Sequence, residues 1–238
     1  MAKKKRVRRK QLLNEPDEFL AFSAKAIRFV VDNQRMVICV VIGVVVIALA
    51  FGGYRYFSNL SERKACAMFE RGRLQYLAEI AGDRTAEYQG KAAEQFEEVI
   101  RKYPSTDAAG FSLFCYADAS YHRDDFQKSI ELYQTALNAF SGNGAIRKLI
   151  WNGLAYAHEA KKDYTSAAEY FQEIIDDRGD FMKADAYNNY GRMMEALNQQ
   201  DKALEAYNMV VQAYPDSVAF QIAKEKVLRL KDASVGTK

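Results

Sequence analysis

Residues 149–174 read LIWNGLAYAHEAKKDYTSAAEYFQEI, and this stretch decides the predicted fold. Its apolar residues recur three or four positions apart on either side of a polar turn at Asp163, which is the spacing of one face of an α-helix. The stretch therefore predicts two helices joined by a short turn. The pattern is W-x2-L-A in the first helix and A-x3-F-x2-I in the second, carried by Trp151, Leu154, Ala155, Ala167, Phe171 and Ile174.

The same pattern recurs on both sides of this stretch, so it is an internal repeat. One unit lies 36 residues downstream, another lies 38 residues upstream, and an earlier unit keeps the second helix of the pattern. The first helix of that earlier unit, around residues 61–81, is expected to be lengthened and to end at Gly82-Asp83. The repeated positions are Tyr187, Tyr190, Gly191, Ala203, Tyr207, Val210 and Pro215 downstream, Leu113, Tyr116, Ala117, Ser129, Tyr133 and Ala136 upstream, and Ala92, Phe96, Val99 and Pro104 in the earlier unit.

The repeat resembles the tetratricopeptide repeat, a helical hairpin that stacks into a solenoid. Small residues stand where the two helices of a hairpin meet, and large residues fill the gap to the next hairpin. A single hairpin cannot bury its apolar face, so three or more must stack. We predict an all-α fold, a tetratricopeptide-repeat α-solenoid of about four helical hairpins over residues 61–232, and another kind of helical hairpin array is the alternative. A capping helix over residues 217–230 is expected to cover the last repeat with Val218, Ile222, Val227 and Leu230, and residues 233–238 are expected to be disordered.

An uncharged stretch of 19 residues, MVICVVIGVVVIALAFGGY, runs from Met36 to Tyr54. As an α-helix it would be roughly 28 Å long, which is close to the hydrocarbon thickness of a bilayer. We therefore predict a single transmembrane helix over residues 35–57, in contact with the lipid bilayer. The alternatives are a buried core helix and a cleavable signal peptide. Cleavage after Ala50, at the A-x-A site formed with Ala48, would leave a soluble chain.

Charge is distributed unevenly along the chain. Residues 1–35 carry ten Lys or Arg against four Asp or Glu, whereas residues 36–238 carry 24 against 27. Because basic flanks stay on the cytoplasmic side of a span, we predict a basic cytoplasmic tail over residues 1–16 and a folded domain on the far side. Residues 17–34 predict an amphipathic juxtamembrane helix, which lies on the inner leaflet or packs on a membrane partner. The acidic folded part does not favour nucleic acid as a partner.

In the tetratricopeptide family the first helix of each repeat lines a concave groove, and the resemblance implies such a groove here. Carried over by register, its positions mix aromatic side chains, amides and carboxylates, which suit an extended or helical peptide. No row of Lys or Arg runs along it, unlike the groove that clamps the C-terminal carboxylate of heat-shock proteins. The predicted partner-binding residues are Phe111, Phe114, Asp118, Tyr121, His122, Leu149, Asn152, Tyr156, Glu159, Asp185, Asn188, Arg192 and Glu195. The alternative is that these side chains are merely solvated.

No catalytic or cofactor motif occurs in the sequence. It lacks G-x-x-x-x-G-K-[ST], G-x-G-x-x-G, H-E-x-x-H and G-x-S-x-G, so we predict no enzyme activity, cofactor, metal or small-molecule substrate. His158 is predicted to be a packing residue rather than a ligand. The three cysteines are not spaced as a metal or redox pair. We favour buried thiols at Cys66 and Cys115, and a disulfide between them is the alternative.

The whole layout resembles bacterial YfgM-like inner-membrane tetratricopeptide-repeat proteins. The matching features are the basic start, Glu15-Pro16-Asp17-Glu18-Phe19 before the span, Gly52-Gly53-Tyr54-Arg55-Tyr56 at its end, and repeats that continue to Pro215. The resemblance implies a periplasmic domain ancillary to the Sec translocon, which contacts translocon subunits or secreted and envelope clients as a chaperone-like adaptor. A scaffold of a division or outer-membrane assembly complex, without client binding, is the alternative.

Overall fold

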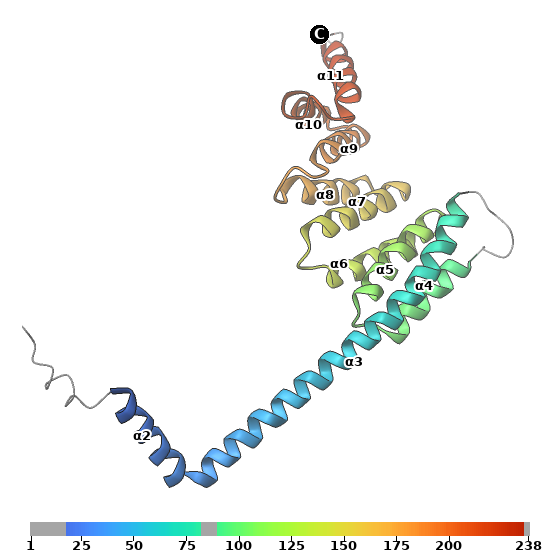
Figure 1. Ribbon diagram of the computed structural model, residues 1–238. Coiled ribbons are helices and arrows are strands. Elements are labelled where there is room, and N and C mark those ends of the chain that lie inside the picture. The colour runs from blue at the N-terminus through green and yellow to red at the C-terminus, as the bar shows by residue number, and fades with distance from the viewer. Residues whose placement is uncertain (1–17, 82–89, 236–238) are drawn as a thin grey trace, which may run out of the picture. The chain divides into compact units, whose positions relative to one another are not determined.

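The computed structural model describes residues 18–81 and 90–235, and within these ranges every regular element is a helix (Figure 1). The chain divides into two compact units, Met1–Ser58 and Asn59–Lys238. The all-α prediction is confirmed. The predicted basic tail, the expected break at Gly82-Asp83 and the last three positions of the chain lie outside the described residues.

The first unit contains α2 (Glu18–Asp32) and the beginning of α3 (Gln34–Ile80), with a turn at Asn33 between them. The backbone N–H and the side-chain amide of Asn33 both donate to the Phe29 carbonyl at 3.0 Å, which satisfies an acceptor in the last turn of α2. α2 leaves large apolar side chains uncovered, and Phe22 is 73% exposed.

The apolar stretch lies within α3. Among the described residues, α3 is the one helix whose length and composition suffice to cross a membrane. None of the residues in its most apolar window is buried, which does not fit the alternative of a core helix. Its exposed side chains include Val40, Val44, Ile47 and Leu49.

α3 does not end where the apolar stretch ends. It continues without interruption to Ile80, so the separate repeat helix expected around residues 61–81 is the C-terminal part of the same helix. Residues 54–64, YRYFSNLSERK, contain neither glycine nor proline. Nothing in that segment removes a backbone donor or favours a break, and helical hydrogen bonding therefore continues through it.

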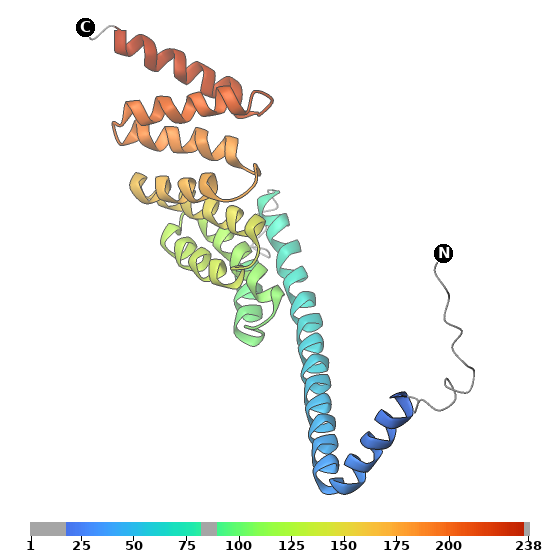
Figure 2. The same ribbon diagram turned by 90° about the vertical axis from the view of Figure 1, so that its left-hand side faces the viewer.

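The second unit is a stack of helical hairpins, visible in Figures 1 and 2 as paired helices from α4 to α11. From α4 onward each helix packs against the next one in the chain. The stack contains four hairpins. They pair the C-terminal part of α3 with α4, α5 with α6, α7 with α8, and α9 with α10. The helices are α4 (Lys91–Lys102), α5 (Asp107–Tyr121), α6 (Phe126–Ala139), α7 (Gly144–Ala160), α8 (Tyr164–Asp176), α9 (Lys183–Ala196), α10 (Gln200–Ala213) and α11 (Ala219–Val235).

Most residues of the repeat pattern lie in the core, whereas Pro104 and Pro215 are exposed and three of the pattern's tyrosines are partly buried, namely Tyr116, Tyr187 and Tyr190. The small ones have no exposed surface, namely Ala92, Ala117, Ala155, Ala167 and Ala203. At Gly191 a Cβ atom would lie 2.8 Å from the Tyr207 ring, so the two helices of the last hairpin approach too closely for any side chain there. The large partners Phe96, Phe171 and Tyr207 are also fully buried.

The capping helix covers the last repeat with a partly different set of residues from the one predicted. Val227 and Leu230 are buried, but Val218 is 92% exposed and Ile222 is 51% exposed. The prediction for Val218 and Ile222 is therefore wrong. α11 begins at Ala219, so its buried stripe follows helical spacing from that residue and continues through Ala223. The helix also extends to Val235, into the segment expected to be disordered.

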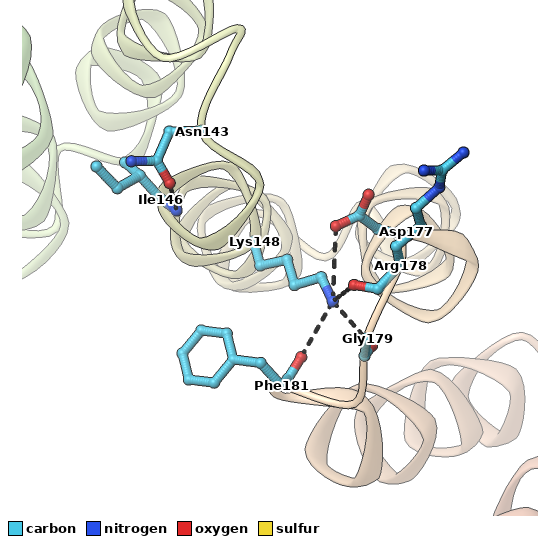
Figure 3. Close-up of polar contacts among 7 residues, drawn as sticks. All are labelled: Asn143, Ile146, Lys148, Asp177, Arg178, Gly179 and Phe181. Atoms are coloured by element: carbon cyan, nitrogen blue, oxygen red, sulfur yellow. Dashed lines mark hydrogen bonds and ion pairs between the residues drawn. The ribbon is translucent and has the colours of Figure 1, made fainter. Parts of the chain in front are cut away.

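Lys148 is an interior residue that the repeat pattern does not predict. It lies on α7 with 2% of its surface exposed, and its ammonium group is surrounded by the loop between α8 and α9 (Figure 3). It donates hydrogen bonds to the carbonyls of Arg178 at 2.9 Å, Gly179 at 3.1 Å and Phe181 at 3.4 Å, and it lies 3.6 Å from the Asp177 carboxylate. The loop that joins two successive repeats is thus held by one cation.

The structure shows the surroundings of the cysteines and of His158. All three cysteines are free, so no disulfide joins Cys66 to Cys115. Cys66 is exposed on α3, which corrects the prediction of a buried thiol, and its thiol donates a hydrogen bond to the Glu62 carboxylate at 3.4 Å. Cys115 is largely buried, and burial raises the pKa of its thiol to about 12. His158 packs against Tyr170 and bonds the Asp163 carboxylate at 2.9 Å.

Candidate peptide-binding groove

A cavity of about 360 Å³ lies between α5 and α7, the first helices of two successive repeats. Seven of the predicted groove residues line it together. They are Phe114, Asp118, Tyr121, His122, Leu149, Asn152 and Tyr156, and the remaining wall is Tyr133 of α6 with Gly153 of α7. Phe111 does not reach this cavity, because its ring packs 5.0 Å from Phe140 instead.

Asp118 is the charged group of this cavity. Its carboxylate accepts a hydrogen bond from the Tyr76 hydroxyl at 2.5 Å and a longer one from the Tyr133 hydroxyl at 3.5 Å. Burial and the neighbouring carboxylate raise the pKa of both phenols, so they stay neutral donors. Two hydroxyls from α3 and α6 therefore fix the carboxylate, whose side chain is still 38% exposed.

Ring-to-ring contacts hold the aromatic walls of the cavity in place. Phe114 meets Tyr133 edge to face at 5.6 Å, and Tyr156 meets the buried Phe171 edge to face at 5.7 Å. Such pairs fix ring orientation as well as contributing about 0.5–1.5 kcal/mol each. The cavity is thus rigid on its apolar sides, and Asn152 contributes an amide to its lining.

Gly153 makes room for this arrangement. A Cβ atom at position 153 would lie 2.4 Å from the Tyr133 ring. Any other residue would push the ring away and take its hydroxyl from Asp118. Sequence reasoning placed Asn152 in the groove but overlooked the glycine beside it.

The next stretch of the groove, between α7 and α9, is filled by internal polar contacts. The Glu159 carboxylate and the Arg192 guanidinium form a two-point ion pair, with one of its contacts at 2.9 Å. Arg192 also donates to Asn189 at 3.1 Å, and Asn189 donates to the Tyr156 hydroxyl at 3.0 Å. The predicted groove residues Tyr156, Glu159 and Arg192 are therefore connected across the two repeats, either directly or through Asn189, which was not among the predicted residues.

Two neighbouring amides of α9 differ in their contacts. The predicted residue Asn188 has a buried Oδ1 atom without a protein partner, whereas Asn189 makes the contacts to α7. Glycine occupies the position equivalent to Asn189 in the preceding repeat, Gly153. The repeat pattern therefore gave no signal that an amide at that position would matter.

The last predicted residues do not share the cavity. Asp185 is exposed in the first turn of α9. Glu195 accepts hydrogen bonds from the Tyr207 hydroxyl at 2.6 Å and the Lys226 ammonium at 3.0 Å, and it also pairs with Arg229. Burial acts to raise the pKa of Glu195, but the hydrogen bonds and the two cations outweigh it and lower that pKa below its ordinary value of 4.5. Glu195 belongs to the junction with α11.

Metal binding has no candidate in the part of the chain that the structure describes, where no three His, Cys, Asp or Glu side chains cluster. What the cavity offers is an aromatic enclosure, an amide and a carboxylate, which are groups that bind a side chain rather than transform one.

Comparison with known proteins agrees with this architecture. Residues 28–236 match the family described as tetratricopeptide repeat-like domain. The chain belongs to the tetratricopeptide repeat-like domain family. The match covers the end of α2, all of α3 and the whole hairpin stack. Domains of this fold bind other proteins or peptides, and the fold is typical of scaffolds rather than enzymes.

Solved structures give the same fold at low sequence identity. A tetratricopeptide repeat protein from Parabacteroides merdae aligns with a TM-score of 0.56 and 14% identity, over 70% of this chain but only 61% of its own. A putative kinesin light chain with TPR-like repeats from Podospora anserina aligns with a TM-score of 0.55 and 15% identity, over 73% of this chain and 88% of its own.

MamA of Desulfovibrio magneticus RS-1 aligns with a TM-score of 0.50 and 13% identity, over 71% of this tetratricopeptide-repeat chain and 96% of its own. At these identities the likeness concerns the fold alone. A search of curated proteins found no match.

Proposed function

We propose that this tetratricopeptide-repeat protein is a membrane-anchored adaptor that binds segments of other proteins in the cavity between α5 and α7. The observation that carries the proposal is the convergence of seven register-predicted residues from two successive repeats on one cavity. Its aromatic walls and polar groups suit a peptide side chain, and no residue of the described part of the chain fills it. The proposal includes no catalysis and no cofactor.

We further propose that α3 anchors the protein in a bacterial inner membrane through residues 35–57. The basic excess in residues 1–35 supports a cytoplasmic N-terminus and a periplasmic repeat domain. The uncovered apolar side chains of α2, together with Lys25 and Arg28, support its lying on the anionic inner leaflet.

Topology is tested by fusing alkaline phosphatase or a fluorescent protein after Lys238. The proposal predicts active phosphatase and a dark fluorescent protein when export proceeds through the translocon. A fluorescent fusion with inactive phosphatase would contradict it. N-terminal sequencing of the membrane-bound protein distinguishes anchoring from cleavage after Ala50.

The partners that we propose are translocon subunits and emerging envelope proteins, contacted as a chaperone-like adaptor. The test places a photocrosslinking amino acid at Asn152 in the cavity and, as a matched control, at Asn138 on the exposed side of α6. Crosslinks to translocon subunits or secretory clients from position 152 and not from position 138 are expected.

Two outcomes would count against this role. Equal crosslinking from both positions would mean that the cavity has no special part in binding. Stoichiometric co-purification of one set of envelope proteins, without client crosslinks from position 152, would instead support a scaffold of a division or outer-membrane assembly complex.

A further inference from the structure

We infer that the cavity between α5 and α7 selects a cationic side chain, lysine or arginine, of an extended peptide. This inference rests on the proposed function, because it specifies which chemistry the same cavity recognises. The pairing of carboxylates with cations differs along the length of the groove.

The carboxylates of the groove are not equivalent. Glu159 is neutralised by Arg192, and Glu195 is neutralised by Lys226 and Arg229. Asp118 has no Lys or Arg within ion-pair distance in residues 18–81 and 90–235, and the basic side chain nearest to its carboxylate there is His122, at 3.8 Å. The cavity therefore holds a carboxylate for which the described chain supplies no permanent cation.

The cations on the neighbouring elements are engaged elsewhere. Arg73 of α3 bonds Glu70 at 2.8 Å, and Arg123 after α5 bonds Glu79 at 2.9 Å. Neither of these guanidinium groups is directed to Asp118. Within residues 18–81 and 90–235, compensation of the Asp118 charge is thus left to whatever enters the cavity.

The Asp118 carboxylate is held in position and can still accept hydrogen bonds from a cationic side chain. Tyr76 and Tyr133 each donate one hydrogen bond to it, which leaves acceptor capacity on both oxygens. Neutral hydroxyl donors fix its position without cancelling its charge. A charge-assisted hydrogen bond to a fixed, partly buried carboxylate is stronger than one to a freely rotating surface group.

The walls suit the rest of a basic side chain. Phe114, Tyr121 and Tyr156 line the cavity around Asp118. Aromatic faces attract ammonium and guanidinium groups, and they also cover the methylene stem of lysine or arginine. An acidic side chain would instead meet a like charge, and a purely apolar one would desolvate the Asp118 carboxylate without supplying a cation or a further hydrogen-bond donor.

The test measures binding of fluorescein-labelled peptides Gly-Leu-Xaa-Leu-Gly to the full chain in a nonionic detergent, by fluorescence anisotropy. Xaa is lysine, arginine, norleucine or glutamate. We expect the lysine and arginine peptides to bind about tenfold more tightly than the norleucine peptide, and the glutamate peptide to bind weakest. Free spermidine is expected to compete only weakly, because it lacks the peptide's backbone and leucines.

Two variants locate the effect. Asp118→Asn should reduce the preference for lysine over norleucine from about tenfold to about onefold. As a control, Asp216→Asn removes an exposed carboxylate from the turn before α11, outside the cavity, and should leave this preference unchanged. If Asp118→Asn does not fold, the comparison of the lysine and norleucine peptides on the unmodified protein still tests the inference.

The outcomes separate this inference from the proposed function. Equal affinity for the lysine and norleucine peptides would overturn the inference while leaving peptide binding intact. Spermidine binding as tight as the lysine peptide would also overturn it, because the cavity would then select a free polyamine. No binding of any peptide, together with no specific crosslinks from position 152, would overturn both.

Discussion

The two ends of the predicted groove are built from the same repeat but carry different chemistry. Between α5 and α7 an aromatic cavity encloses Asp118, with which no Lys or Arg of residues 18–81 and 90–235 forms an ion pair. Between α7 and α9, and at the junction with α11, Glu159 and Glu195 are paired with cations from the following helices. The same groove face therefore binds its own neighbours at one end and leaves a charge uncompensated at the other. The repeat fold places side chains on the groove face. Side chains of the following helix determine whether such a residue is paired within the protein or remains available to a partner.

The largest effect on stability is expected at Lys148, which holds the loop between α8 and α9. Replacing Lys148 by methionine leaves three loop carbonyls without their donor, and we expect a loss of about 3 kcal/mol in the free energy of unfolding. Urea unfolding can be followed through Trp151, the only tryptophan, which is 4% exposed on the same helix. As a control, Lys161→Met removes an exposed lysine and should change stability by less than about 0.5 kcal/mol.

A smaller effect is expected at the open end. Gly153→Ala places a Cβ atom 2.4 Å from the Tyr133 ring, and overpacking of this kind costs about 1–3 kcal/mol. After the gain of about 1 kcal/mol in helix propensity, we expect net destabilisation of up to about 2 kcal/mol, together with weaker peptide binding.

Gly144→Ala on the same helix is the matched control for that change. The new Cβ atom would meet its nearest neighbour, Asp177, at an ordinary 3.6 Å. This variant should be neutral or slightly stabilising. If both alanine variants behaved alike, the close packing of Tyr133 on α7 would not be what shapes the cavity.

Much of this arrangement could be predicted from sequence, and the exceptions have physical causes. The buried repeat positions were correct because close helix packing admits only alanine or glycine at Ala117, Ala155 and Gly191. The cavity residues followed from the same register. Tyr76 was missed because the long α3 helix carries no complete repeat motif from which a register could be taken.

Other differences arose where contacts come from outside one repeat. Glu195 was placed in the groove because the pattern does not reveal that Lys226 and Arg229 of α11 would reach it. Lys148 and Asn189 depend in the same way on a loop or a helix of the neighbouring repeat. Periodicity identifies which face a residue occupies, but pairing across repeats depends on the individual side chains opposite.

The smallest stability effect is expected at Glu195, and it should depend on pH. The pKa of Glu195 is lowered in the folded protein, so its stabilisation is present above the ordinary value of 4.5 and is lost as pH falls through the lower folded pKa. Glu195→Gln should therefore cost about 1 kcal/mol near neutral pH, and the difference from the unmodified protein should shrink below pH 4.5. Urea midpoints measured across this range would show it, and a constant difference would refute it.

The two carboxylates differ in role, because Asp118 binds a partner whereas Glu195 stabilises the fold. The most direct measurement is the affinity of the lysine peptide for Asp118→Asn and for Glu195→Gln, determined side by side on the folded full-length variants. The account predicts about a tenfold loss for Asp118→Asn and an unchanged affinity for Glu195→Gln. Equal losses in both variants, or a loss confined to Glu195→Gln, would contradict it.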